Sequence, residues 1–231
     1  MHDRYNLFKE SHKAIRSLLL DLVRKSGRTD FNDRDSLDMF RAEVRGAFAL
    51  LESHACHEET FIASLIQAHA PELAGLIGGS HQDQERQSRH IIESLGAIDA
   101  RSVDAAPRGH SIVVWLSRFA GEILYHMADE EERLLPLLWR ALTDEELIEV
   151  ERRLVASVPP DETASFLSWM LPAVNTPERV AKLRNIRASS PPEVFSFVRD
   201  LSRTVLSPAD EAALSLGLAE TKPQEPLALA S

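Results

Sequence analysis

The 231-residue sequence is poor in the features that define several large classes of protein. Its one cysteine, Cys56, excludes an internal disulfide framework and a metal site built from several thiolates of one chain. No apolar run approaches the ~20 residues of a membrane-spanning helix, and no apolar signal segment follows Met1. The formal net charge of −10 disfavours nucleic acid and anionic membranes as partners. We therefore expect a soluble, cytoplasmic protein with no nucleic-acid or membrane partner.

Alternating strand patterns are also missing, whereas apolar residues recur at helical spacing along almost the whole chain. This periodicity predicts four long helices, over residues 3–25, 37–68, 71–100 and 110–135. Long helices joined by short connectors are typical of an up-down-up-down four-helix bundle. The predicted fold class is therefore all-α, a four-helix bundle with a smaller helical C-terminal extension.

The extension carries start signals for several shorter helices. Thr143 and Ser190 each precede a glutamate at capping-box spacing, and Thr176 and Ser207 each stand directly before a proline. No chemical motif is found in this region, and we expect its helices to pack on the bundle or to form a homodimer surface. The expected organisation is a bundle over residues 1–142, an extension over 143–216 and a flexible tail over 217–231.

Histidine is the residue type whose placement points to chemistry. Three of the nine histidines precede a glutamate by four residues, with one such pair on each of the last three long helices. One helical turn separates the members of a pair, about 6 Å of rise, so both side chains can reach one centre from the same face. A further histidine lies on the apolar face of the first helix. The residues concerned are His12, His54/Glu58, His81/Glu85 and His126/Glu130.

The antiparallel arrangement brings these residues to one level of the bundle. The pairs on the second and third helices are about equally far from the turn at 69–71, and the third and fourth pairs are matched across the connector at 101–109. One buried layer would then hold four imidazoles and up to three carboxylates, which is costly unless cations compensate. Imidazole and carboxylate ligands suit Fe, Mn or Zn. The natural arrangement gives each of two metals two histidines, with two bridging carboxylates and open positions for a small molecule.

Some neighbouring residues have less certain places in this layer. Glu85 could be an additional ligand or could point past the site, because Gln84 competes for the inward position. His57 lies to one side of the seam, where it could support a ligand from behind or face the surface. Asp129, Glu131 and Glu132 are expected on a solvated face beside the inward Glu130. No catalytic residue is assigned.

The residues resemble the hemerythrin-like (HHE, cation-binding) four-helix bundles over about residues 5–142, including the run from His126 to Pro136. The resemblance implies two iron ions with an oxo or hydroxo bridge. It places His12 and His54 on one iron and His81 and His126 on the other, with Glu58 and Glu130 bridging. The set is closer to the bacterial di-iron proteins with four histidines and two glutamates than to the oxygen-carrying hemerythrins. The carriers have a histidine where this chain has Glu85.

The expected function is that of a non-haem di-iron protein that binds or senses oxygen, nitric oxide or peroxide, or handles iron. The sequence favours such a binding protein over an enzyme. Two alternatives stay open. One is a di-iron enzyme that reduces peroxide or nitric oxide, and the other is a regulatory or interaction module in which the metal only stabilises the bundle.

Overall fold

The computed structural model describes residues 4–69 and 71–220, with the side chains of residues 72–79 outside the description. The chain forms two compact units, Met1–Thr163 and Ala164–Ser231. All regular elements within the described residues are helices. None of these helices combines the length and the apolar character that crossing a bilayer requires.

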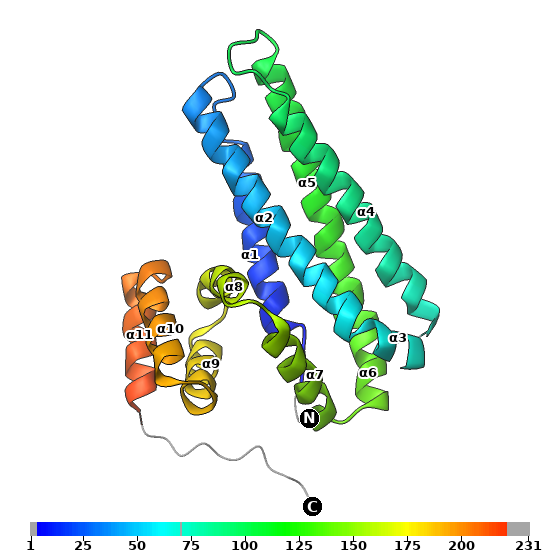
Figure 1. The fold of residues 1–231 in the computed structure, drawn as a ribbon, viewed down its shortest axis with the longest axis vertical. Helices are drawn as coiled ribbons and strands as arrows, with labels where there is room; N and C mark the ends of the chain where they lie inside the picture. Colours follow the sequence, from blue (N-terminus) through cyan, green and yellow to red (C-terminus); the bar gives the residue numbers. More distant parts are fainter. Residues whose placement is uncertain (1–3, 70, 221–231) are drawn as a thin grey trace, which may run out of the picture. The chain divides into compact units, whose positions relative to one another are not determined.

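Four long helices form the body of the first unit (Figure 1). Consecutive long helices are antiparallel, and α1 and α4 each pack against both α2 and α5. This arrangement confirms the predicted up-down-up-down bundle. The four helices are α1 (Lys9–Ser26), α2 (Arg34–Phe61), α4 (Pro71–Gly96) and α5 (Ala105–Asp129).

The bundle core consists of the apolar stripes that the sequence predicts. On α5, for example, Ile112, Leu116, Phe119 and Ile123 recur at steps of three and four and are each at most 3% exposed. Burying side chains of this size stabilises the fold by about 1.5–3 kcal/mol each relative to exposure. The other helices contribute Ile15, Leu19, Leu22, Leu37, Phe40, Val44, Ala47, Leu51, Ile91 and Leu95.

Two of the predicted long helices are interrupted where the sequence predicts continuous ones. The second ends at Phe61, and a short helix, α3 (Ala63–His69), follows. At this break Ile62 is 2% exposed, and it joins a separate apolar cluster with Ile66, Phe8 and Leu138. Packing against that cluster, rather than helix propensity, thus sets the direction of the chain after Phe61.

The second interruption is a π-helical turn, η1 (Glu130–Leu134), between α5 and α6 (Leu135–Ala141). It is closed by a hydrogen bond from the Leu135 N–H to the Glu130 carbonyl, five residues back. Pro136 follows directly; it has no N–H, and its ring would clash with the carbonyl four residues earlier in a regular helix. A wider turn before the proline relieves this conflict, and such turns are frequent at functional sites.

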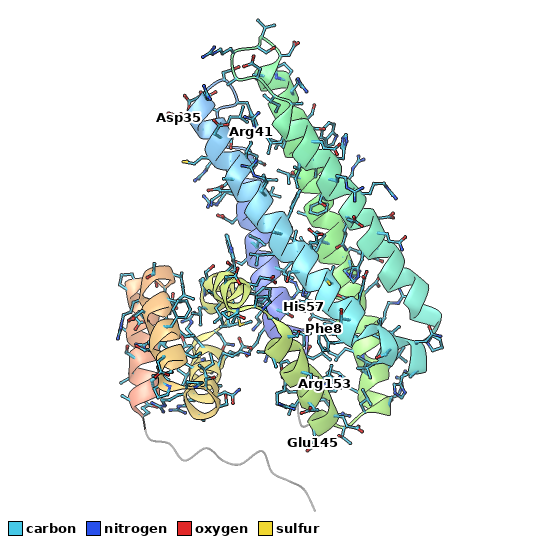
Figure 2. The ribbon with its side chains drawn as sticks, in the orientation of Figure 1. Phe8, Asp35, Arg41, His57, Glu145 and Arg153 are labelled. Atoms are coloured by element: carbon cyan, nitrogen blue, oxygen red, sulfur yellow. The ribbon has the colours of Figure 1, made fainter. Side chains whose placement is uncertain are left out.

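Side chains at both ends fix the helices against one another. Arg41 of α2 donates hydrogen bonds to the carbonyls of Leu95, Gly96 and Ile98, where α4 ends (Figure 2). At the opposite end, Arg4 donates to the carbonyls of residues 139 and 142 and pairs with Asp144. These contacts hold the register that places the polar layer of the bundle at one height.

The remaining helices are α7 (Asp144–Ser157), α8 (Pro160–Ala173), α9 (Thr176–Ser189), α10 (Pro192–Val205) and α11 (Pro208–Ala219). The α7 helix belongs to the first unit, so the boundary follows it rather than preceding it. In the second unit, Arg179 is 2% exposed and donates to the carbonyls of Leu171 and Val174, which end α8. The expected tail overlaps the end of α11 at residues 217–219, and residues 221–231 lie outside the description.

Two of the four capping signals of this region are confirmed. Thr143 forms the predicted capping box with Glu146, and Ser207 caps α11 through the N–H of Asp210. Two of the assignments were wrong. The cap of α9 is Asn175 rather than Thr176, and Ser190 caps no helix because α10 begins only at Pro192. At α9 the capping box that Asn175 forms with Glu178 sets the start of the helix one residue earlier than predicted.

Candidate metal centre

A cluster of histidines and glutamates lies inside the four-helix bundle. The structure brings together all six ligands that the sequence suggests, in two overlapping groups whose ligand atoms lie within 4.8 Å of one another. One group is His12, His54 and Glu58; the other is Glu58, His81, His126 and Glu130. Each long helix contributes at least one of these residues, and the π-helical turn contributes Glu130.

The cluster is almost completely removed from solvent. His12 is 0% exposed and Glu130 is 1% exposed, while Glu58, His81 and His126 lie between 5% and 7%. The side chain of His54 is the most open, at 16%. Two carboxylates at this depth are costly unless opposite charge compensates them.

Both glutamates have the disposition of bridging carboxylates. Glu58 Oε1 lies 3.1 Å from His54 Nε2 and 3.6 Å from His12 Nε2, while its Oε2 lies 3.4 Å from His81 Nε2. Glu130 Oε2 lies 3.4 Å from His12 Nε2, and its Oε1 lies 3.3 Å from His126 Nε2. Each carboxylate therefore turns one oxygen to each half of the cluster.

Several of the atoms in these close approaches form no hydrogen bond. His12 Nε2, both oxygens of Glu58 and Glu130 Oε2 are buried without any hydrogen-bond partner. Nitrogen and oxygen atoms that instead point at a common cation, about 2.1 Å away, lie about 3.0 Å apart when they are neighbours in an octahedron. The orphaned atoms and their spacing thus fit divalent cations, and the nitrogen and oxygen donors suit Fe, Mn or Zn.

His12 is held from behind by a carboxylate. Its Nδ1 lies 2.8 Å from Glu131 Oε1, and Arg16 donates to the same oxygen at 2.8 Å. The Nδ1–H···O bond fixes the ring and leaves Nε2 facing Glu58 and Glu130. Burial alone would lower the pKa of His12, but the three carboxylates outweigh it and raise this pKa from 6.5 to about 9. Without a metal, His12 therefore holds a proton at the position that a cation would take.

Glu58 and His81 are shifted by the same balance of burial and charge. Burial would raise the pKa of Glu58, but His54, His12 and His81 hold this pKa well below 4.5. Burial would lower the pKa of His81, but Glu58, Glu130 and Glu59 raise it above 6.5. His81 Nδ1 lies 3.3 Å from Glu59 Oε1, so this ring also has a carboxylate behind it.

Glu131 and Glu59 are functional residues that the sequence reasoning missed. Glu131 was expected on a solvated face, and this was wrong: its side chain is 26% exposed and bonded to His12. Consecutive residues of a helix lie 100° apart, so Glu58 and Glu130 face the cluster while Glu59 and Glu131 each reach the other side of a neighbouring histidine ring. The signal in the sequence was their shared spacing, since each follows a ligand histidine of its own helix by five residues.

Two other candidate residues lie outside the cluster. The Glu85 side chain is 60% exposed and pairs with Arg89, so the possible ligand role is corrected: four residues after His81, this position turns to the outer face of α4. His57 is half-buried beside Ser53, whose hydroxyl donates to Glu162 at the start of α8. In Figure 2 it lies on α2, and its Nδ1 lies 3.4 Å from the Ser53 hydroxyl oxygen.

The buried histidines and glutamates lie in a part of the chain that matches one protein family. A family model described as the hemerythrin HHE cation-binding domain matches residues 3–138, more than half of the chain. The chain belongs to this family. The matched range of the hemerythrin domain contains all six residues of the cluster and ends within α6. Cation binding by the bundle is thus supported both by the family and by the buried donor set.

The chain is also similar to parts of larger proteins. It is 23% identical over 211 residues to the zinc finger protein BRUTUS of Arabidopsis thaliana. It is 20% and 21% identical to the F-box/LRR-repeat protein 5 of Xenopus laevis and of Mus musculus, over 215 and 227 residues. These alignments cover 87%, 93% and 96% of the chain but 16%, 31% and 32% of the relatives, so the chain spans less than a third of their length. No solved structure matches the chain.

Proposed function

We propose that the hemerythrin domain holds two iron ions and binds a small oxidant, namely oxygen, nitric oxide or peroxide, as a sensor, scavenger or iron-handling protein. The observation that carries the proposal is the bridging disposition of Glu58 and Glu130 between two pairs of histidines. Four imidazole nitrogens and four carboxylate oxygens provide eight ligand atoms. Two octahedral ions together have twelve coordination positions, so some of these positions remain open to a small ligand.

The chain's own residues would prepare these positions. Iron, when bound, supplies redox chemistry toward a small ligand. His12 and His81 are oriented by Glu131 and Glu59, which fixes the ring nitrogens that face the cluster. Phe8 stacks on His12 with 5.0 Å between ring centroids and is 1% exposed, so it excludes water from that side.

A binding protein and an enzyme differ in turnover. Anaerobically reduced protein is mixed with limiting oxygen, nitric oxide or peroxide, and the equivalents consumed per chain are counted. The proposal expects about stoichiometric consumption without a second turnover. Consumption of many equivalents would contradict it and establish the enzyme alternative.

One observation favours the alternative of a regulatory module. The alignment with the mouse F-box/LRR-repeat protein 5 covers 227 residues, so it extends beyond residue 138 into the helices that follow the bundle. In such a module the metal only stabilises the bundle, and the extension binds a partner. Glu58→Ala and Glu130→Ala would then abolish metal binding and lower the melting temperature, while wild-type protein shows no change with any of the three oxidants.

The remaining proposals concern location and assembly. The single Cys56 supports a reducing compartment such as the cytoplasm. For a homodimer through the C-terminal helices, the support is α10, where Val194 and Phe197 are 42% and 51% exposed. Sedimentation of the wild type and of Phe197→Glu tests this contact. A monomeric wild type would contradict it.

A further inference from the structure

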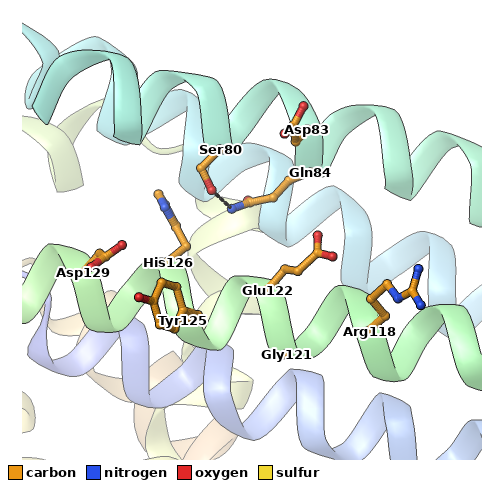
Figure 3. A pocket seen from close by; sticks show the side chains of 9 residues that line it. All are labelled: Ser80, Asp83, Gln84, Arg118, Gly121, Glu122, Tyr125, His126 and Asp129. Atoms are coloured by element: carbon orange, nitrogen blue, oxygen red, sulfur yellow. Dashed lines mark hydrogen bonds between the residues drawn. The ribbon is translucent and has the colours of Figure 1, made fainter.

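A cavity of about 400 Å³ lies between α4 and α5 (Figure 3). Ser80, Asp83 and Gln84 of α4 form one wall, and α5 forms the other with residues that include Gly121, Glu122 and His126. Tyr125, another lining residue, is 71% exposed, so the cavity reaches the surface of the bundle.

His126 is the link between the cavity and the cluster. It lines the cavity and is 7% exposed, and in Figure 3 its ring points from α5 toward α4, near Ser80. Its Nε2 lies 3.3 Å from Glu130 Oε1 and 3.0 Å from His81 Nε2. A single imidazole thus has one side toward the cavity and one nitrogen in the cluster.

The ionisable residues that line the cavity carry more negative than positive charge. Three carboxylates, Asp83, Glu122 and Asp129, line the cavity together with one guanidinium, that of Arg118. Arginines beyond the lining pair with Asp83 and Asp129. Both members of the Asp83 pair are exposed, and such a surface pair holds a carboxylate weakly, whereas the Asp129 side chain is 15% exposed. Carboxylates around a recess raise the local concentration of cations.

The volume suits an ion that still carries its water. A divalent ion with six waters takes about 200 Å³, because each water has a share of about 30 Å³ in the liquid. The cavity exceeds this value, whereas the cluster behind His126 is closed by buried side chains. The ion would therefore exchange water for protein ligands at His126.

We propose that the α4–α5 cavity is the passage through which a hydrated divalent cation reaches and leaves the cluster. The inference rests on the proposed binding of metal at the cluster. It assigns the outer carboxylates to attraction of the ion, and His126 to its transfer inward.

Two helical glycines allow a matched test. A Cβ atom built at Gly121, which lines the cavity, meets nothing within 4 Å, and the same holds for the exposed Gly46 of α2. Gly121→Leu therefore adds an apolar side chain to the lining, and its Cβ meets no neighbouring atom. Gly46→Leu makes the same change of residue, with the same gain in helix propensity, at a site that does not line this cavity.

The measurement uses full-length protein loaded with Co²⁺, whose visible absorption reports on the bound ion. Release to excess chelator and uptake by metal-free protein are followed for both variants, and the dissociation constant is measured at equilibrium. An obstructed passage slows uptake and release by the same factor, which leaves the dissociation constant unchanged. We expect Gly121→Leu to slow both rates about fivefold or more, and Gly46→Leu to match the wild type.

Charge provides a second arm of the test. Glu122→Gln keeps the shape of the lining and removes one negative charge, so uptake should fall about threefold at low salt and less at high salt. If Gly121→Leu takes up and releases Co²⁺ as fast as the wild type, the proposed passage is wrong. The partly exposed side of His54 would then be the next candidate for the route of the ion. A changed dissociation constant would overturn the passage too, since it would reveal a distorted site. Wild-type protein that binds no Co²⁺ or iron would instead overturn the proposed function.

Discussion

The carboxylate behind His12 offers the sharpest perturbation of the centre. Glu131→Gln keeps an oxygen that can accept the Nδ1–H bond of His12 at 2.8 Å, but it removes the negative charge. Loss of a partner of this kind weakens metal binding about 10- to 100-fold, or about 1.4–2.7 kcal/mol. Glu131→Leu removes the acceptor as well, and its loss of metal affinity should lie at or beyond the upper end of that range.

The π-helical turn supplies a matched control for this change. Glu132 is the next residue in the same turn, and it is exposed. Glu132→Gln makes the identical change to the charge of the chain at this exposed residue. Competition of each variant with a chelator of known affinity gives the dissociation constant.

The two variants should therefore separate clearly. We expect the dissociation constant of Glu132→Gln to lie within twofold of the wild-type value, because solvent and salt screen an exposed charge. Glu131→Gln should weaken metal binding at least tenfold. Equal affinities in the two variants would refute the role assigned to Glu131.

Three further predictions test the buried charges and the core. In metal-free protein the pKa of His12 is raised to about 9, so its stabilisation is complete below pH 6.5 and is lost as the pH rises through 9. Urea unfolding should show a loss of about 2–3 kcal/mol between pH 7 and 10, and metal-loaded protein that lost as much would contradict this. Glu85→Gln should leave the metal content unchanged and Glu58→Gln should lower it, since the two side chains are 60% and 5% exposed; metal analysis giving the same content for both would contradict the placement. Leu116→Ala, at 1% exposure, should cost about 2–5 kcal/mol in urea unfolding with or without metal, and a cost below 1 kcal/mol would contradict its place in the core.

The bundle and the position of its polar layer could be predicted from the sequence, because both follow from one periodicity. Apolar residues at steps of three and four define the inner face of each helix, and Ile112, Leu116 and Phe119 illustrate how directly burial follows the pattern. Equal distances from the turns then bring His54 and His81 to one height. Neither step needs knowledge of contacts between side chains.

The parts that could not be predicted depend on local departures from that periodicity. The break after Phe61 follows from packing of Ile62 in a cluster formed by distant segments. Glu131 contacts His12 from outside the apolar stripe, so the periodicity that defines the inner face does not indicate it. Glu85 failed as a ligand for the opposite reason: spacing made it equivalent to Glu58 and Glu130, but the rotation of α4 turns it to solvent.

The central claim is that the buried cluster of His12, His54, Glu58, His81, His126 and Glu130 holds two iron ions. Metal analysis of aerobically purified full-length protein, combined with its near-ultraviolet absorption spectrum, tests this most directly. We predict about two irons per chain with oxo-bridge absorption, and loss of both in Glu58→Ala. Metal-free protein that is as stable as metal-reconstituted protein would contradict the account.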